Sequence, residues 1–235
     1  MDPDDYVDLD YIEYLYYLLE KYSTRMSVCQ HRVLFSNGRT KDYGKSGDEK
    51  LSNKACLERM LYHDVIDTSA WAKLYERSLF EEVKYPVGKL FEDIGTTYAL
   101  MLQCETIAIG YESKYTYVLR SNSIVSGKFK PSKLDLLEMT DRMGKDVLKV
   151  YPDLRKAVLR RRIYARFSTL NQMLDTNDFQ KEKMEIIRFL RHYKTDIIKD
   201  PKTPKRDKMA AILLALNYKL YRFCWKQYLL RIKGR

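Results

Sequence analysis

The sequence PVGKLFEDIGTTYALMLQC, residues 86–104, is interpreted as a loop that enters a helix, with the adjacent carboxylates Glu92 and Asp93 at the transition. Pro and Gly in the first three positions are typical of a loop. A carboxylate at a helix start interacts favourably with the positive end of the helix dipole, so a structural role accounts for the pair. A role in proton transfer is compatible with the same position, and the flanking sequence has to distinguish the two.

The N-terminal sequence predicts a helix followed by a hairpin. Residues 8–22 have the spacing of an amphipathic helix. Its apolar stripe consists of Leu9, Ile12, Leu15, Tyr16 and Leu19. Residues 26–44 predict a hairpin, because Asn37 and Gly38 favour the positive φ of a tight turn.

Further short elements are expected between this hairpin and residue 120. Ser52 is the expected N-cap of a helix that begins at the next residue. A strand or turn is expected over residues 67–75 and a short helix over 76–82. Residues 106–120 predict two strands.

The pattern changes in the C-terminal part of the chain. From about Leu134 onward we expect four helices and no strand, with breaks near Tyr151, Asn177 and residues 200–206. The fold class is therefore predicted to be α/β, with a C-terminal helical region. The expected division is an α/β part over residues 1–127 and a basic helical domain over residues 128–235.

The composition is that of a globular protein, with 45% hydrophobic and 32% charged residues. The longest apolar stretch, residues 209–218, is about half of the roughly 20 residues that a membrane-spanning helix needs. The four cysteines are too widely spaced for a CxxC pair, and the N-terminus is not a secretory signal. We therefore expect a reducing, cytoplasmic location.

The net charge of +11 is divided unevenly along the chain. Residues 1–127 contain 15 Lys and Arg against 20 Asp and Glu, a net charge of −5, whereas the remainder contains 28 against 12, a net charge of +16. Only the second part has an electrostatic reason to approach a polyanion or an anionic membrane surface.

The basic sequence LRRRIYARF, residues 159–167, has two interpretations. Its arginines could contact nucleic-acid phosphates, or they could form the solvated face of a helix. We favour the solvated face and expect no nucleic-acid partner.

Three stretches resemble a known family when they are taken in order: DPDD at residues 2–5, SAWAKLYERSLF at 69–80 and GKLFEDIGTTY at 88–98. Together they resemble glycosyltransferase family 2, the inverting, metal-dependent transferases of the GT-A fold, and in particular bacterial members that build capsule or exopolysaccharide. In that family an R..SI segment follows, which corresponds here to Arg120, Ser123 and Ile124. The resemblance implies that residues 1–127 form the C-terminal part of a GT-A domain.

The resemblance implies a nucleotide-sugar donor and a divalent metal, Mn²⁺ or Mg²⁺. The pyrophosphate leaving group develops negative charge, which a hard cation held by carboxylate oxygens would stabilise. Asp2 and Asp4 alternate on a segment restrained by Pro3, so their side chains are expected to point the same way and to bind that metal. An acidic N-terminal cap is the alternative role for these residues.

The same resemblance assigns roles on the acceptor side, where a saccharide or lipid-linked hydroxyl attacks the sugar. Asp93, or otherwise Glu92, corresponds to the general base that removes the proton of this hydroxyl. Trp71 corresponds to a sugar-stacking aromatic, with core packing as its alternative. Lys73 and Arg120 are candidates for phosphate or acceptor contacts, or else surface cations, and Ser123 belongs to the same binding segment.

The C-terminal sequence is consistent with peripheral contact to the inner leaflet of the plasma membrane. An apolar stripe at helical spacing is accompanied by cations and interfacial aromatic residues. The stripe consists of Met209, Ile212, Leu213, Leu216, Leu220 and Phe223. Packing against neighbouring helices explains the stripe equally well.

The family resemblance also implies about 90 to 100 residues before the DPDD segment, which would bind the nucleotide. Two hypotheses follow. In the first, the chain is a glycosyltransferase of cell-surface polysaccharide synthesis that is either split, with its donor half a separate polypeptide, or a truncated C-terminal remnant. In the second, it is a non-catalytic remnant or scaffold whose basic helices bind membrane or a partner chain.

Overall fold

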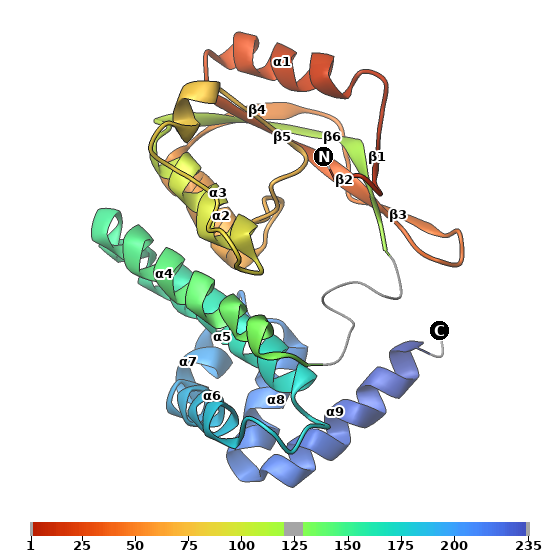
Figure 1. Ribbon diagram of the computed structural model, residues 1–235, viewed down its shortest axis with the longest axis vertical. Coiled ribbons are helices and arrows are strands. Elements are labelled where there is room, and N and C mark those ends of the chain that lie inside the picture. Colours follow the sequence, from red (N-terminus) through yellow and green to blue (C-terminus); the bar gives the residue numbers. More distant parts are fainter. Residues whose placement is uncertain (1, 120–128, 234–235) are drawn as a thin grey trace.

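The computed structural model describes residues 2–119 and 129–233 and contains a mixed β-sheet with helices on both faces, followed by a helical bundle (Figure 1). The sheet elements and their helices are β1 (Tyr6–Val7), α1 (Tyr11–Tyr22), β2 (Met26–Leu34), β3 (Thr40–Asp42), β4 (Asp48–Ser52), α2 (Asn53–Tyr62), β5 (Lys73–Tyr75), η1 (Arg77–Phe80), α3 (Glu92–Leu102) and β6 (Thr106–Val118). The bundle contains η2 (Pro131–Leu134), α4 (Asp135–Val150), η3 (Pro152–Leu154), α5 (Arg155–Gln172), α6 (Gln180–His192), α7 (Lys194–Lys199), α8 (Lys205–Leu216) and α9 (Tyr218–Lys233).

The two long strands β2 and β6 form the centre of the sheet and run parallel to each other, with Val28 paired to Ile109. Antiparallel strands flank them: β4 and β1 pair with successive parts of β6, while β5 and β3 pair with successive parts of β2. The sheet therefore has one parallel pair surrounded by short antiparallel strands.

Strand β6 is continuous over 13 residues, so the prediction of two strands in this segment is wrong. Gly110, within the strand, serves a close approach between the strand and a helix. A Cβ atom at this position would lie 2.4 Å from the hydroxyl oxygen of Tyr14 and 2.6 Å from Cδ1 of Leu18, both on α1. The glycine therefore allows α1 to pack tightly on the strand.

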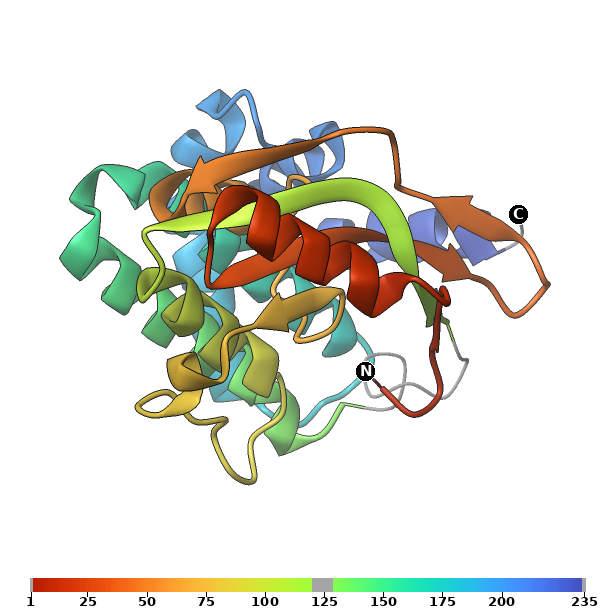
Figure 2. The ribbon, with the colours of Figure 1, turned by 90° about the horizontal axis from the view of Figure 1, so that it is seen from above.

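Helix α1 covers one face of the sheet, and α2 and α3 cover the other (Figures 1 and 2). The predicted helix is confirmed, but the predicted apolar stripe is wrong in part. The side chains that α1 buries are Tyr11, Leu15 and Leu18, whereas Ile12 and Tyr16 are exposed. Spacings of three and four fit either set, and contact with the sheet selects between them.

Several local predictions for the α/β part are confirmed. The hairpin joins β2 to β3, and Gly38 has a φ of +79° in the turn. The Ser52 hydroxyl accepts a hydrogen bond from Ala55 N at 3.3 Å and caps α2. The strand and the short helix expected before residue 83 correspond to β5 and η1.

The described part of the bundle contains six α-helices where four were predicted. The three expected breaks are present. Two further breaks divide α6 from α7 at Tyr193 and α8 from α9 at Asn217. Asn217 has an extended backbone, and its side chain accepts hydrogen bonds from Lys219 N and Leu220 N, so it caps α9.

Helix α5 lies between two hydrophobic clusters. Its Ala157, Val158 and Ala165 belong to a cluster that also contains residues of β2, β6 and α2 to α4. Its Phe167 and Leu170 belong to a second cluster formed with α6 to α9. The first cluster therefore contains residues from both sides of the predicted division at residue 127.

The basic run on α5 is not a solvated face, so that interpretation is wrong. Arg160, Arg161 and Arg166 are 5–8% exposed, because α5 is packed by other elements around most of its circumference. Arg160 pairs with Asp207 and Arg166 pairs with Asp141. These arginines are not available to contact a nucleic acid on the surface.

Among the described residues, no helix has both the length and the apolar character that crossing a membrane requires.

Candidate active site

Asp93 lies in the first turn of α3, where the sequence predicted a carboxylate at a helix start. The helix begins after Phe91, whose φ of +59° turns the chain sharply into it. Asp93 Oδ1 accepts a hydrogen bond from Ile94 N at 2.8 Å. Burial and, to a smaller extent, the charge of Glu92 raise the pKa of Asp93 to about 6, against the opposing effects of this hydrogen bond and of the Arg161 guanidinium. A carboxylate with such a pKa is suited to accept a proton near neutral pH.

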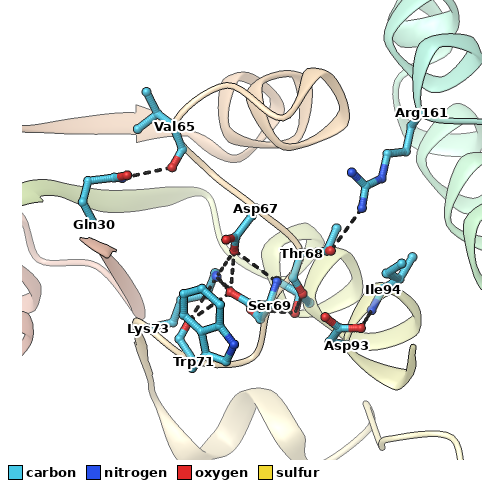
Figure 3. A network of polar contacts seen from close by, with 11 residues as sticks. Gln30, Val65, Asp67, Thr68, Ser69, Trp71, Lys73, Asp93, Ile94 and Arg161 are labelled. Carbon is cyan, nitrogen blue, oxygen red and sulfur yellow. Dashed lines mark hydrogen bonds and ion pairs between the residues drawn. The ribbon is translucent and has the colours of Figure 1, made fainter. Parts of the chain in front are cut away.

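The loop after α2 is held beside Asp93 by a buried ion pair (Figure 3). Lys73 Nζ lies 3.1 Å from Asp67 Oδ1 and donates hydrogen bonds to the carbonyl oxygens of Ser69 at 2.7 Å and Trp71 at 3.3 Å. Burial raises the pKa of Asp67, but the Lys73 ammonium and the Ser69 hydroxyl outweigh that effect and hold it well below its usual value. Asp67 is therefore a fixed negative charge.

From the family resemblance, Lys73 is a candidate for phosphate or acceptor contact, or else a surface cation. Its side chain is 1% exposed, and its ammonium is surrounded by the loop that it holds. This geometry makes Lys73 a positioning residue for the loop rather than a group that faces a ligand. Thr97 Oγ1 of α3 also donates a hydrogen bond to Thr68 O at 2.9 Å, so the loop is joined to the helix that carries Asp93.

Trp71 both packs and lines the site. Its ring stacks on Tyr115 at a centroid distance of 4.7 Å and on Tyr117 at 5.6 Å, and the edge of His31 meets it at 4.9 Å. The next residue, Ala72, has a φ of +56°, a strained conformation for a residue with a Cβ. The strain and the aromatic contacts together orient the indole.

The N-terminal carboxylates lie against the end of β6. Asp5 is buried, where it accepts hydrogen bonds from the Tyr115 hydroxyl at 2.7 Å and from Val118 N at 2.8 Å. Asp2 is held through its backbone N, which donates to the same Tyr115 oxygen at 3.2 Å. Burial and the charge of Asp5 raise the pKa of Asp2, and Asp4 adds to the effect. Asp5, which sequence analysis did not single out, is therefore the anchor of this segment.

A cavity of about 350 Å³ brings these segments together. It is lined by Asp2, His63, Asp67, Thr68, Ser69, Trp71, Phe91, Asp93, Ile94, Tyr117, Leu136, Arg161, Tyr164, Ser168 and Gln172. Of the predicted site residues, Asp2, Trp71 and Asp93 line it. Asp4, Glu92 and Lys73 are outside this described lining, and Arg120 and Ser123 lie outside the described residues.

Asp67 and the α5 side chains in the cavity wall were missed by sequence analysis. Asp67 carried a usable signal, because an Asp two residues before a Ser can form an Asx turn, and Ser69 N donates to Asp67 Oδ1 at 3.1 Å. Arg161 carried none, since it is one arginine in a run of three. Only the packing of α5 distinguishes Arg161 from the neighbouring arginines, because it places Arg161 in the cavity wall.

The residues present fit a divalent cation only with ligands from elsewhere. Among the described residues, no group of three or more His, Cys, Asp or Glu side chains is arranged to hold a metal ion. Burial raises the pKa of Asp2, and the charges of Asp5 and Asp4 add to this effect; such a gathering of carboxylates favours a cation nearby. Mg²⁺ is commonly bound by one or two carboxylates, substrate phosphates and water, and this carboxylate cluster suits that mode.

Comparison with known proteins gives a shared fold and a homologue. No protein-family model matches the chain. The crystal structure of S. aureus TarS 1–349 in complex with UDP-GlcNAc has a TM-score of 0.59 and 15% identity over 96% of this chain and 65% of that chain. Another crystal structure of S. aureus TarS 1–349 has a TM-score of 0.57 and 16% identity over 100% of this chain and 66% of that chain. The chain therefore has an α/β fold with a C-terminal helical region that it shares with TarS, which confirms the predicted fold class.

A similarity in sequence shows which class of enzyme the chain is related to. Glycosyltransferase GlyA of Streptococcus pneumoniae serotype 4 is 29% identical over 133 residues, which cover 53% of this chain and 19% of GlyA. The chain is thus a homologue of a glycosyltransferase, as the motifs indicated. It spans 19% of the length of GlyA and 65% of TarS 1–349.

Proposed function

We propose that the chain contributes the acceptor side and the general base of a glycosyltransferase that inverts the configuration of the transferred sugar. The observation that supports this most strongly is the cavity itself, in which Asp2, Trp71 and Asp93 converge from three separate segments of the chain. The raised pKa of Asp93 supports its role as the base.

In the proposed reaction, an oxygen of the acceptor hydroxyl attacks the anomeric carbon of a nucleotide sugar. The new carbon–oxygen bond forms as the bond from that carbon to the phosphate oxygen breaks, and the nucleoside diphosphate leaves with the electron pair. Asp93 takes the proton of the attacking hydroxyl, and Trp71 offers an aromatic face against which a sugar ring can stack. Attack from the side opposite the leaving group inverts the anomeric centre.

Asp2 and Asp4 are the proposed metal-binding residues. A bound Mg²⁺ or Mn²⁺ would neutralise charge that develops on the leaving diphosphate. UDP-GlcNAc, the donor present in the TarS complex, is the first nucleotide sugar to test. The acceptor is proposed to be a saccharide or a lipid-linked saccharide of the cell surface, as the family resemblance implies.

The test is the transfer activity of the Asp93→Asn variant. With UDP-GlcNAc, Mn²⁺ or Mg²⁺ and a panel of saccharide acceptors, we expect the rate to fall about 10²- to 10⁴-fold, because the variant cannot accept the proton. Glu92→Gln is the matched control, since Glu92 is exposed and is not among the described residues that line the cavity; its rate should stay within about threefold of the original.

The assay is run with the chain alone and, to test the split-enzyme hypothesis, with a donor-half polypeptide added. Equal rates for the original chain and Asp93→Asn, under conditions where transfer occurs, would remove Asp93 from its role. Failure of the chain to bind or turn over any nucleotide sugar in both conditions would leave the scaffolding hypothesis as the better account.

A second proposal concerns where the protein acts, namely at an anionic membrane surface through α8 and α9. Most of the predicted apolar stripe faces outward, with Leu216 70% exposed and Phe223 62% exposed, while Ala211, Leu214 and Tyr221 make the buried contacts. Residues 205–235 contain nine Lys and Arg against one Asp. Exposed apolar side chains beside many cations are typical of interfacial binding.

A further inference from the structure

Arg161 on α5 is a buried cation in the wall of the cavity. It is 5% exposed, and its Nη2 donates a hydrogen bond to Thr68 Oγ1 at 3.2 Å. Its guanidinium lies 5.1 Å from the ring centroid of Tyr164, and its Nε is buried without a hydrogen-bond partner. Figure 3 shows the side chain extending from α5 toward Thr68 and the start of α3.

Each of the other arginines of the run has an ion-pair partner among the described residues, and Arg161 has none. Arg160 lies 2.9 Å from Asp207, and Arg162 lies 2.7 Å from Asp141. Within the described residues, no carboxylate lies within ion-pair distance of Arg161. Asp93 and Asp67 act on its charge from a longer range, and Asp67 is already paired with Lys73. A buried charge without a partner is costly to the folded state, so its presence in a cavity indicates a ligand of opposite charge.

The polar groups around Arg161 are arranged along one face of α5. Tyr164, Ser168 and Gln172 follow Arg161 at intervals of three and four residues, and all four line the same cavity. Gln172 Oε1 is buried without a hydrogen-bond partner, a second polar group left unsatisfied by the described protein atoms. A guanidinium fork with hydroxyl and amide groups beside it matches a phosphate or carboxylate.

We propose that Arg161 makes the site selective for an acceptor that carries an anionic group, a phosphate or a carboxylate, near the hydroxyl that reacts. This inference rests on the proposed transferase function. Arg161 lies on the side of Thr68 and Asp93, where the acceptor hydroxyl is expected, so its ligand belongs to the acceptor. The diphosphate of the donor is instead expected beside the carboxylates of Asp2 and Asp4.

The test compares binding of acidic and neutral sugars to the whole chain by isothermal titration, at constant ionic strength. Glucose is the neutral probe, glucuronate and glucose 6-phosphate are the acidic probes, and UDP with Mn²⁺ reports on the donor side. We expect at least one acid to bind roughly tenfold more tightly than glucose, since hydrogen bonds to charged groups contribute about that much. Arg161→Gln should remove the preference, and Arg161→Lys should keep part of it.

Arg155→Gln is the matched control, because Arg155 is an exposed arginine on the same helix, and it should leave the preference unchanged. UDP binding should be the same in all variants. Thermal unfolding without ligand separates binding from a structural role: removing an unpaired buried charge should leave the melting temperature of Arg161→Gln equal or higher, whereas losing a structural contact would lower it.

The proposal is overturned if neither acid binds more tightly than glucose, or if Arg161→Gln weakens glucose and the acids equally. A loss of UDP binding with an unchanged acid preference would assign Arg161 to the donor instead. None of these readouts requires turnover, so a failure of the transferase assay and a failure of this proposal are distinguishable.

Discussion

At the scale of single residues, two carboxylates of the site, Asp67 and Asp93, differ in pKa because their surroundings differ. Asp67 has an ammonium and a hydroxyl beside it, and its pKa is held well below the usual value. Asp93 is half-buried beside Glu92, and its pKa is raised to about 6. One group thus stays charged while the other can gain and lose a proton near neutrality, and this difference supports the assignment of Asp93 as the base.

The pH dependence of Asp93 is predicted to affect activity and stability in opposite directions. Because the base must be ionised, kcat/KM should rise about tenfold per pH unit below pH 6 and level off above it. The folded-state pKa lies above the ordinary value of 3.8, so the stability associated with this group is present below pH 3.8 and is lost as pH rises through about 6. Asp93→Asn should therefore melt at a higher temperature than the original chain at pH 7.5.

The melting temperatures of the two proteins should converge near pH 4, which calorimetry at the two pH values would measure. A lower melting temperature of Asp93→Asn at pH 7.5 would show that the carboxylate is a structural helix-start group rather than a destabilised base.

Lys73 is predicted to be a determinant of stability. Lys73→Met removes the partner of Asp67, so the free energy of unfolding should fall by about 3 kcal/mol, the scale for breaking a buried ion pair. Denaturant unfolding measures this change. Adding Asp67→Asn to Lys73→Met should recover part of the loss, because it removes the unpaired charge. If Lys73→Met instead leaves stability unchanged and weakens ligand binding, the cation faces a ligand after all.

At the scale of elements, α8 and α9 differ from the other amphipathic helices in what they leave exposed. Helix α1 also exposes apolar side chains, Ile12 among them at 58%, but it belongs to the part of the chain with net negative charge. Helices α8 and α9 combine exposed Leu216 and Phe223 with many cations. Only the second combination is suited to an anionic bilayer.

Vesicle binding tests this difference between elements. The chain should bind phosphatidylcholine vesicles that contain phosphatidylglycerol, and binding should weaken as salt rises. Leu216→Ser with Phe223→Ser should reduce binding tenfold or more, because each buried side chain contributes roughly 2 kcal/mol. Ile12→Ser is the control of similar exposure and should bind like the original chain. Equal binding to vesicles without phosphatidylglycerol, or an equal loss in Ile12→Ser, would contradict the proposal.

At the scale of the whole molecule, α5 joins the sheet to the bundle. Val158 packs in the first hydrophobic cluster and Phe167 in the second, so neither cluster is complete without this helix. The buried pair of Arg160 with Asp207 also connects α5 to α8. Packing that is shared in this way favours a single cooperative unfolding transition.

The two tryptophans allow this cooperativity to be measured. Trp71 lies in the cluster beneath α1, and Trp225 packs against the cluster of α6 to α9. In Trp71→Phe the fluorescence reports on Trp225, and in Trp225→Phe it reports on Trp71. For each variant, we expect the urea transition followed by fluorescence to have the same midpoint as the transition followed by far-UV circular dichroism. Well-separated midpoints would show that the sheet and the bundle unfold as independent domains.

Local chemistry was sufficient to determine several features from the sequence alone. The Asn37–Gly38 turn, the Ser52 cap and the start of α3 at the Glu92–Asp93 pair depend on contacts between residues a few positions apart, and these are encoded wherever the segment folds. The ordered motifs likewise indicated the relation to a glycosyltransferase, because they concern residue type and order rather than contact.

Tertiary packing decided which side chains are buried and which are exposed. The exposed side of α1, the continuity of β6 at Gly110 and the burial of Lys73 all depend on partners distant in the sequence. The same holds for Arg161, whose sequence neighbours are also arginines, and which becomes part of the site only because α5 packs against the loop at Thr68. Spacing along a chain specifies a periodicity, but the burial of a charge and its need for a counter-ion arise only when the elements are assembled.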